Sequence, residues 1–328
     1  MAIDRHAARA DRIRLAWTEG GRLGPVLRDI ADDLHPTSFV GPLWIGSVAA
    51  AVGSTLVGFL LVDAMLLGLC ACLVRRLARR VADGDPEFRR RAGRCGVLLF
   101  LTGIATLRCS MQLHVDVLLL AIALAALDAA AAWSESGRTR AVATMALAHV
   151  AGVFTKLSYL PWLATSPVAW LVTPMRRRTW RAALLPVVVP LVALATHVAY
   201  FGGPSMLRRD FDHLTDSWNL SPRKLIHFAG ECVLACQWLP WVLRTPKHSS
   251  ARASPARRLL VVMLVVYAVA LAAWRLPAIG RLMLPIATLL AILAAGRVAA
   301  ATGRQQRVVV ATIVIGIVVA TIGVHFDL

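Results

Sequence analysis

The chain has 328 residues, of which 58% are hydrophobic and 16% charged, and its mean hydropathy is +0.66. A soluble domain usually has about 45–50% apolar residues, so this composition excludes an ordinary soluble globular protein. The formal net charge of +18 would be typical of a nucleic-acid-binding protein if the chain were soluble. In so apolar a chain, Arg and Lys in cytoplasmic loops explain the charge better, and we expect no nucleic-acid partner.

Long apolar blocks separated by short polar stretches predict an all-α fold, a polytopic transmembrane helical bundle. We expect one transmembrane domain over residues 1–328, with an outer loop of juxtamembrane helices at 1–53 and the bundle at 54–328. Several segments are shorter than the roughly 20 residues that cross a bilayer, which indicates helices that meet at a water-filled cavity. The predicted segments are 39–52, 54–74, 95–107, 113–133, 141–154, 157–173, 182–201, 225–243, 259–274, 281–300 and 308–326.

Arginine clusters alternate with these apolar segments, at 75–94, 138–140, 175–181, 244–258 and 297–307. If every segment except 39–52 crosses once, giving about ten crossings, all the clusters fall on one side of the membrane. The positive-inside rule places that side in the cytoplasm. The outer side then receives the N-terminal region and the turns and loops at 108–112, 155–156, 202–224 and 275–280. We expect an integral, multi-pass protein of a bacterial plasma membrane whose functional face lies outside the cytoplasm.

The first outer stretch, residues 4–46, contains ARADRIRLAWTEGG, which reads as an amphipathic helix that ends at a glycine pair. Its apolar face suits a helix lying on a membrane surface. His35 follows, just before the short segment 39–52. From composition alone, an interfacial lid with scattered charge is favoured over a catalytic loop.

The second outer stretch is RCSMQLHVDVLLLAIALAAL, residues 108–127, in which His114 and Asp116 precede a long apolar helix. An acid near a helix N-terminus is favoured by the helix dipole, so a capping role is one interpretation of Asp116. An acid at the edge of a membrane segment beside a histidine is also a functional candidate. The residues leave both interpretations open.

The third stretch, GVFTKLSYLP at 152–161, places Lys156 between two apolar segments. A charge at the centre of a membrane span costs about 2.5–3.5 kcal/mol on insertion scales. The predicted topology removes most of this cost, because it puts Lys156 at an outer turn. The lysine then either snorkels to the interface or binds an anion such as a phosphate at the edge of a cavity.

The fourth stretch, WRLPAIGRLMLPIATLLAILAAG at 274–296, contains Arg275 and Arg281 around an outer turn. Arginines on the outer side go against the topological bias of the chain. Arginine is the preferred bidentate partner of phosphate, although ordinary loop charge also explains these residues.

These four stretches, in this order, resemble the polyprenyl-phosphate-sugar-dependent glycosyltransferases of the GT-C superfamily. The likeness is closest to the protein-O-mannosyltransferase and lipid A aminoarabinose transferase branch, glycosyltransferase family 39. Its motifs are matched by an acid in the first outer loop and by HPTSFVGPLW, LHVDVLLLAI, FTKLSYLPWLATSP and GRLMLPIATLLAILAAG. The match begins at the family's first outer loop, Asp4 is followed by Arg5, and Leu282 stands where the family has tyrosine. We therefore expect a truncated or diverged member that lacks the family's first helix.

The resemblance implies an inverting transfer of a sugar from a polyprenyl-phosphate donor to a glycan, lipid or protein acceptor of the cell envelope. A carboxylate of the first outer loop would be the general base, with Asp4 the best match and Asp11 the alternative. Lys156, Arg281 and Arg275 would hold the lipid phosphate as it leaves. Asp116, His114 and His35 would line the substrate pocket. Membrane lipid and the lipid-linked sugar are the expected partners.

Two other classes remain open: a transporter of a small molecule or lipid-linked substrate, and a non-catalytic, diverged GT-C-like protein. Transporters often have inverted repeats with matched broken helices, and no such repeat is evident in the sequence. The six cysteines form no CxxC pair and no histidines have zinc-ligand spacing. Some relatives of the resembled family use a divalent metal, so metal dependence stays open, and the residues identify no cofactor besides the polyprenyl-phosphate sugar as donor substrate.

Overall fold

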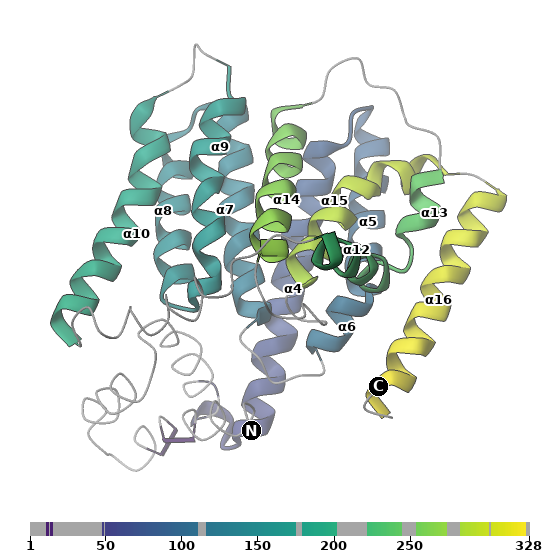
Figure 1. The fold of residues 1–328 in the computed structure, drawn as a ribbon, viewed down its shortest axis with the longest axis horizontal. Coiled ribbons are helices and arrows are strands. Elements are labelled where there is room, and N and C mark those ends of the chain that lie inside the picture. The colour runs from purple at the N-terminus through teal and green to yellow at the C-terminus, as the bar shows by residue number, and fades with distance from the viewer. Residues whose placement is uncertain are drawn as a thin grey trace.

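The computed structural model describes residues 11–12, 14–15, 48, 50–110, 116–174, 179–201, 222–244, 254–273, 283–301 and 303–325. Every regular element of these residues is a helix (Figure 1). The helices are α4 (Thr55–Val81), α5 (Pro86–Leu101), α6 (Ile104–Ser110), α7 (Asp116–Ser136), α8 (Thr139–Val153), the 3₁₀ helix η1 (Leu157–Ala164), α9 (Thr165–Val172), α10 (Trp180–Phe201), α12 (Pro222–Ala235), α13 (Leu239–Arg244), α14 (Pro255–Ala273), α15 (Leu284–Ala300) and α16 (Arg304–His325).

Within the described residues, three helices are long and apolar enough to cross a membrane alone: Leu56–Val81, Asp116–Ser136 and Trp180–His197. The all-helical fold and its membrane-type helices agree with the sequence prediction. The ten crossings stay a prediction, as do the juxtamembrane helices of the outer loop, most of which lies outside the described residues.

From α4 to α10 the chain runs alternately up and down the bundle, with α5 and α6 forming one pass and η1 and α9 another (Figure 1). As a result, the end of α4, the start of α5, the end of α7 and the starts of α8, α10 and α14 all lie at the upper end of Figure 1. The described arginines of the predicted clusters are on these helix ends and on the adjoining ends of α13, α15 and α16. The break after α8 lies at the opposite, lower end.

Helix α7 is the centre of the bundle, packed against α4, α8, α9 and α14. It is rich in alanine, and small side chains allow neighbouring helices to approach closely. Its large side chains Leu120, Leu124, Leu127 and Trp133 are fully buried. By contrast, the exposed apolar side chains of α4 and α10 place these two helices at the rim, where lipid would cover them.

Two segments differ from the prediction of single straight helices. Segment 95–107 is divided at Thr102 and Gly103 into α5 and α6, and segment 225–243 is divided into α12 and α13. The Gln237 amide explains both breaks, because it lies in the turn between α12 and α13 and donates to the Thr102 carbonyl at 2.8 Å. Its own oxygen accepts from the Ile104 N–H at 3.4 Å. Helix α12 lies across the bundle rather than along it (Figure 1).

Candidate functional site

The break between α8 and η1 positions Lys156. Helix α8 ends at Val153, and the N–H groups of Thr155 and Lys156 both donate to the Gly152 carbonyl, at 3.0 and 3.1 Å. The backbone of Lys156 is extended, and the residue is the N-cap of η1. The chain therefore turns at 154–156, as the sequence predicted, and the lysine side chain leaves from the junction of two helices.

The aromatic ring of Tyr159 fixes the geometry of this break. Tyr159 is fully buried, and its hydroxyl is 2.9 Å from Nδ1 of His149, which is also fully buried. A Cβ atom at Gly152 would lie 2.4 Å from the Tyr159 ring, so only glycine leaves room for this ring. The contact ties η1 to the end of α8 and limits the positions that Lys156 can occupy.

Lys156 forms an ion pair with Asp116, the first residue of α7. The lysine Nζ donates to Oδ1 of the carboxylate at 2.9 Å. The Asp116 side chain is 6% exposed and that of Lys156 is 32% exposed, so the pair is buried on the acid side and open on the basic side. Asp116 stabilises the ammonium group and the helix dipole at once. The structure thus joins two residues that the sequence had proposed separately.

Oδ2 of Asp116 is buried and has no hydrogen-bond partner among the described residues. The same holds for His149 Nε2, Ser158 Oγ, Trp162 Nε1 and Thr165 Oγ1, which lie on α8, η1 and the start of α9. Buried polar groups are nearly always hydrogen-bonded, so each of these unsatisfied atoms needs an explanation, such as a bound water or a polar ligand.

An aromatic contact joins η1 to α14. The rings of Trp162 on η1 and Tyr267 on α14 are 5.1 Å apart, and both side chains are buried. Trp162, Tyr267 and the His149–Tyr159 pair are residues that the sequence reasoning missed. The aromatic residues within SYLPW were a usable signal, whereas the distant Tyr267 carried none.

The other predicted site residues do not join this group in the part of the chain that the structure describes. Asp4, His35, His114, Arg275 and Arg281 lie outside the described residues. Asp11 is described, and its carboxylate Oδ1 is 3.1 Å from Nε of Arg14, one helical turn away. The base role of Asp4 or Asp11 and the phosphate role of the two arginines therefore stay predictions.

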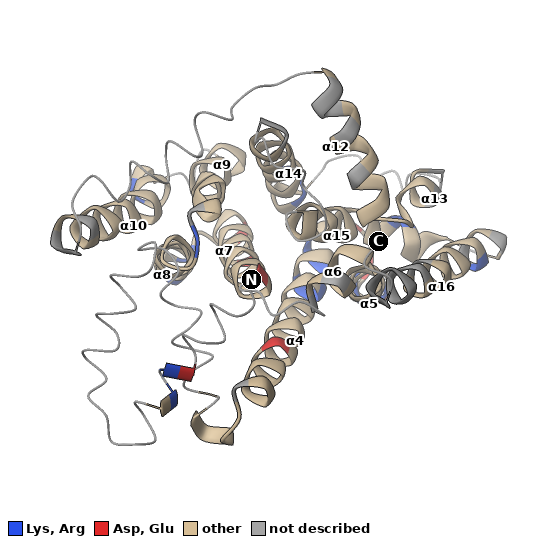
Figure 2. Cartoon of the chain, turned by 60° about the horizontal axis from the view of Figure 1, so that its bottom comes forward, with Lys and Arg blue, Asp and Glu red and all other residues tan. Residues whose placement is uncertain are grey.

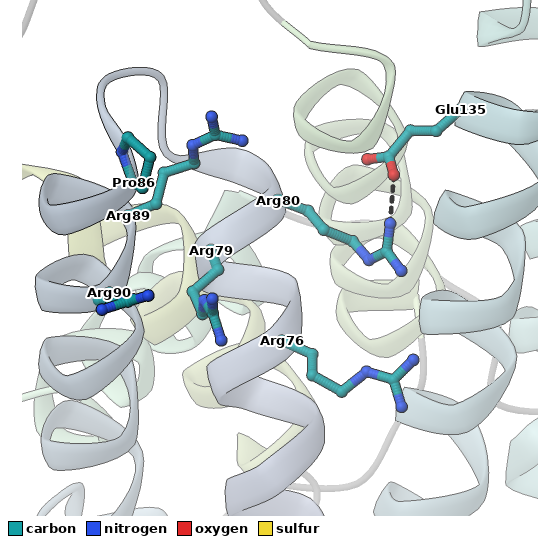
Figure 3. Close-up of a pocket in the computed structure, with 7 residues that line it drawn as sticks. All are labelled: Arg76, Arg79, Arg80, Pro86, Arg89, Arg90 and Glu135. Atoms are coloured by element: carbon teal, nitrogen blue, oxygen red, sulfur yellow. Dashed lines mark hydrogen bonds and ion pairs between the residues drawn. The ribbon is translucent and has the colours of Figure 1, made fainter.

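A second charged cluster lies at the other end of α7. Asp128 accepts from Nε of Arg80 at 3.2 Å through Oδ1 and pairs with Nη2 of Arg76 at 2.8 Å through Oδ2. Arg80 also pairs with Glu135 through Nη1 (Figure 3). Both oxygens of this buried acid are satisfied, which distinguishes it from Asp116. Asp63, an acid on α4 that is 7% exposed, has no ion pair with any described residue.

Arginines of α4 and α5 line a cavity of about 520 Å³ beside this cluster (Figure 3). Its lining residues are Arg76, Arg79, Arg80, Pro86, Arg89, Arg90 and Glu135. The sequence had counted these arginines as a topological signal and not as a site. At the lower end of the bundle, which Figure 2 brings forward, charged residues are sparse on the described helix ends.

Comparisons with protein-family models, with curated proteins and with solved structures gave no match for this chain.

Proposed function

We propose that this protein is a membrane-embedded glycosyltransferase that moves a sugar from a polyprenyl-phosphate donor to a hydroxyl acceptor. The site is the lower end of the bundle, where Lys156 meets Asp116. The observation that carries the proposal is this buried ion pair, in which one carboxylate oxygen has no partner among the described residues and the lysine side chain is 32% exposed. The two residues fall in the two stretches where the sequence resemblance expects a substrate pocket and a phosphate-binding cation.

The distribution of charge supports the orientation that this function requires. The described arginines of the basic clusters lie at the end of the bundle opposite the ion pair (Figure 1). Under the positive-inside rule the arginine end is cytoplasmic, which puts Lys156 and Asp116 at the outer face of a bacterial plasma membrane. A polyprenyl-phosphate sugar in the outer leaflet would reach that face directly.

The chemistry assigned to Lys156 is stabilisation of the leaving group. Its ammonium group has three N–H donors, and the contact with Asp116 uses one of them. The remaining donors would bind the phosphate oxygens as the bond between the anomeric carbon and the phosphate oxygen breaks. Asp116 acts through Lys156 as a positioning residue, because its carboxylate accepts from the lysine Nζ and holds the side chain in place.

The remaining step is removal of the acceptor proton. The acceptor hydroxyl attacks the anomeric carbon from the side opposite the phosphate, its proton passes to a carboxylate, and the polyprenyl phosphate departs with inversion of the sugar. Asp4 is the proposed carboxylate and Asp11 the alternative, both from the first outer loop. Arg275 and Arg281 are proposed to share the phosphate charge with Lys156.

The test is a transfer assay with the full chain in membrane vesicles and radiolabelled polyprenyl-phosphate sugars. The wild type should release the label from the lipid and deliver it to an acceptor. Lys156→Ala should lower transfer by about 10²–10³-fold, the range for loss of one donor to a developing oxyanion. Arg140→Ala is the matched control, since it removes an exposed cation at the opposite end of the bundle.

Absence of transfer with every donor tested, together with movement of the intact lipid-linked sugar across the vesicle membrane, would overturn the proposal in favour of a transporter. Transfer that Lys156→Ala leaves intact would overturn the role assigned to the ion pair. If Asp4→Ala and Asp11→Ala both left transfer unchanged, the base would have to be another residue.

A further inference from the structure

The exposed face of α4 is uncharged over most of its length and basic near its C-terminal end. A stripe of exposed residues recurs at helical spacing from one end to the other: Leu56, Val57, Leu60, Leu61, Ala64, Met65, Gly68, Leu69, Cys72, Arg75, Arg76 and Arg79. Charge is absent from this stripe until Arg75, and from there on arginine dominates it. At 1.5 Å per residue, the uncharged part from Leu56 to Arg75 is about 28 Å long, close to the roughly 30 Å of bilayer hydrocarbon.

This geometry places the arginine cavity at the level of lipid headgroups. The cavity begins where the apolar stripe ends, since Arg76 and Arg79 belong to both. Helix α4 is at the rim of the bundle, so acyl chains can cover the stripe below the cavity (Figure 2). A lipid lying against α4 would therefore bring its headgroup to these guanidinium groups.

The charge inside the cavity is not neutralised by its own acids. Arg76 and Arg80 pair with Asp128, and Arg80 also pairs with Glu135. Arg79, Arg89 and Arg90 have no ion pair with any described residue, although Arg89 donates through Nε to the Gly84 carbonyl at 3.1 Å. Three guanidinium groups of α4 and α5 thus line one cavity of about 520 Å³, and none has an acidic partner among the described residues.

We propose that this cavity binds the phosphate headgroup of an anionic membrane lipid of the leaflet at the arginine end of the bundle, with the acyl chains on the exposed stripe of α4. Guanidinium groups match phosphate oxygens in bidentate geometry. The continuous apolar stripe below the cavity favours a lipid over a free phosphate as the occupant. The proposal requires α4 to span the membrane, but it is independent of glycosyl transfer.

The experiment uses the purified full chain in an uncharged detergent. Phosphatidylglycerol and phosphatidylcholine with identical acyl chains are titrated separately, and bound lipid is counted by native mass spectrometry while the thermal midpoint is followed. We expect phosphatidylglycerol to bind and to raise the midpoint, and phosphatidylcholine to do neither. The variant R79Q/R90Q should lower the apparent affinity for phosphatidylglycerol by about thirtyfold, since each basic group contributes roughly a factor of five.

The matched control is R138Q/R140Q, which removes the same charge from exposed positions at the same end of the bundle but outside the cavity. It should change the affinity by less than about twofold, because these groups do not contact the headgroup. An equal loss in both double variants would show diffuse attraction and overturn the site. Equal protection by inorganic phosphate at the same concentration would overturn the lipid as its occupant.

Discussion

The two ends of α7 each carry a buried carboxylate, and the two are partnered differently. Asp116 and Asp128 are both 6% exposed. Asp128 has a cation on each oxygen, whereas Asp116 has one lysine and a second oxygen that no described residue satisfies. The two carboxylates are therefore equally buried. They differ in whether the second oxygen has a cation partner among the described residues.

This difference in ion pairing assigns a different role to each end of α7. A fully paired buried carboxylate links its helices, because removing it would leave Arg76 of α4 without its partner and Arg80 with Glu135 alone. A half-paired carboxylate contributes less to stability and leaves an acceptor available to a ligand. The Asp128 end is accordingly the structural joint between α4 and α7, and the Asp116 end is the proposed site of chemistry.

Removing the charge of Asp128 should have the largest effect on stability. Asp128→Asn takes away the ion-pair partner of Arg76 and one of the two partners of Arg80, and breaking a buried ion pair commonly costs about 3–5 kcal/mol. Because Arg76 is 59% exposed and stays solvated, we expect a loss of about 2–4 kcal/mol. Titration of the protein in detergent with SDS, followed by near-UV circular dichroism, measures the loss. An unchanged midpoint would contradict the structural role of this end.

Gly152→Ala should damage the other end through packing. The new Cβ would meet the Tyr159 ring, which is held by its contact with His149, and overpacking of this kind costs about 1–3 kcal/mol. The break that positions Lys156 would shift, so transfer should fall by more than the loss of folded protein explains. Gly68→Ala is the control, since its Cβ would meet nothing within 4 Å on the exposed stripe of α4. Similar behaviour of the two variants would count against the role of Tyr159.

Glu135→Gln should have the smallest effect. Its side chain is 34% exposed, and Arg80 would keep Asp128 as a partner. Exposed ion pairs contribute little, so the expected change in the free energy of unfolding is about 0.5 kcal/mol or less. The same SDS titration measures it. A loss as large as that of Asp128→Asn would mean that Glu135, and not Asp128, holds the arginines.

The local part of this arrangement could be predicted from the sequence. Short apolar segments on both sides of Lys156 predicted the turn at 155–156, and the alternation of arginine clusters with apolar runs placed Lys156 and Asp116 at one end. Both predictions depend on short-range patterns. The breaks at Thr102 and near Gln237 were not predicted, because they depend on an amide that contacts backbone more than 130 residues away.

The sequence could not predict which acidic residue forms an ion pair with which basic residue. Asp116 is 40 residues from Lys156, and Asp128 is 48 residues from Arg80. Which cation meets which acid depends on how α4, α8 and η1 pack around α7, and no local signal encodes it. The packing of α4 against α5 is likewise not evident from the sequence. The arginines of 75–94 were therefore interpreted only as a topological signal and not as the lining of one cavity.

The most direct test of this account compares Asp116→Asn with Asp128→Asn in the same transfer and SDS-titration experiments, with transfer expressed per folded molecule. Asp116→Asn should lower transfer by about ten- to hundredfold, as loss of a positioning partner does, and should lower the free energy of unfolding by less than Asp128→Asn does, because it breaks one ion pair and not two. Asp128→Asn should lose stability and keep its transfer rate. The account is contradicted if Asp116→Asn transfers sugar at the wild-type rate, or if the two variants lose stability and transfer in equal measure.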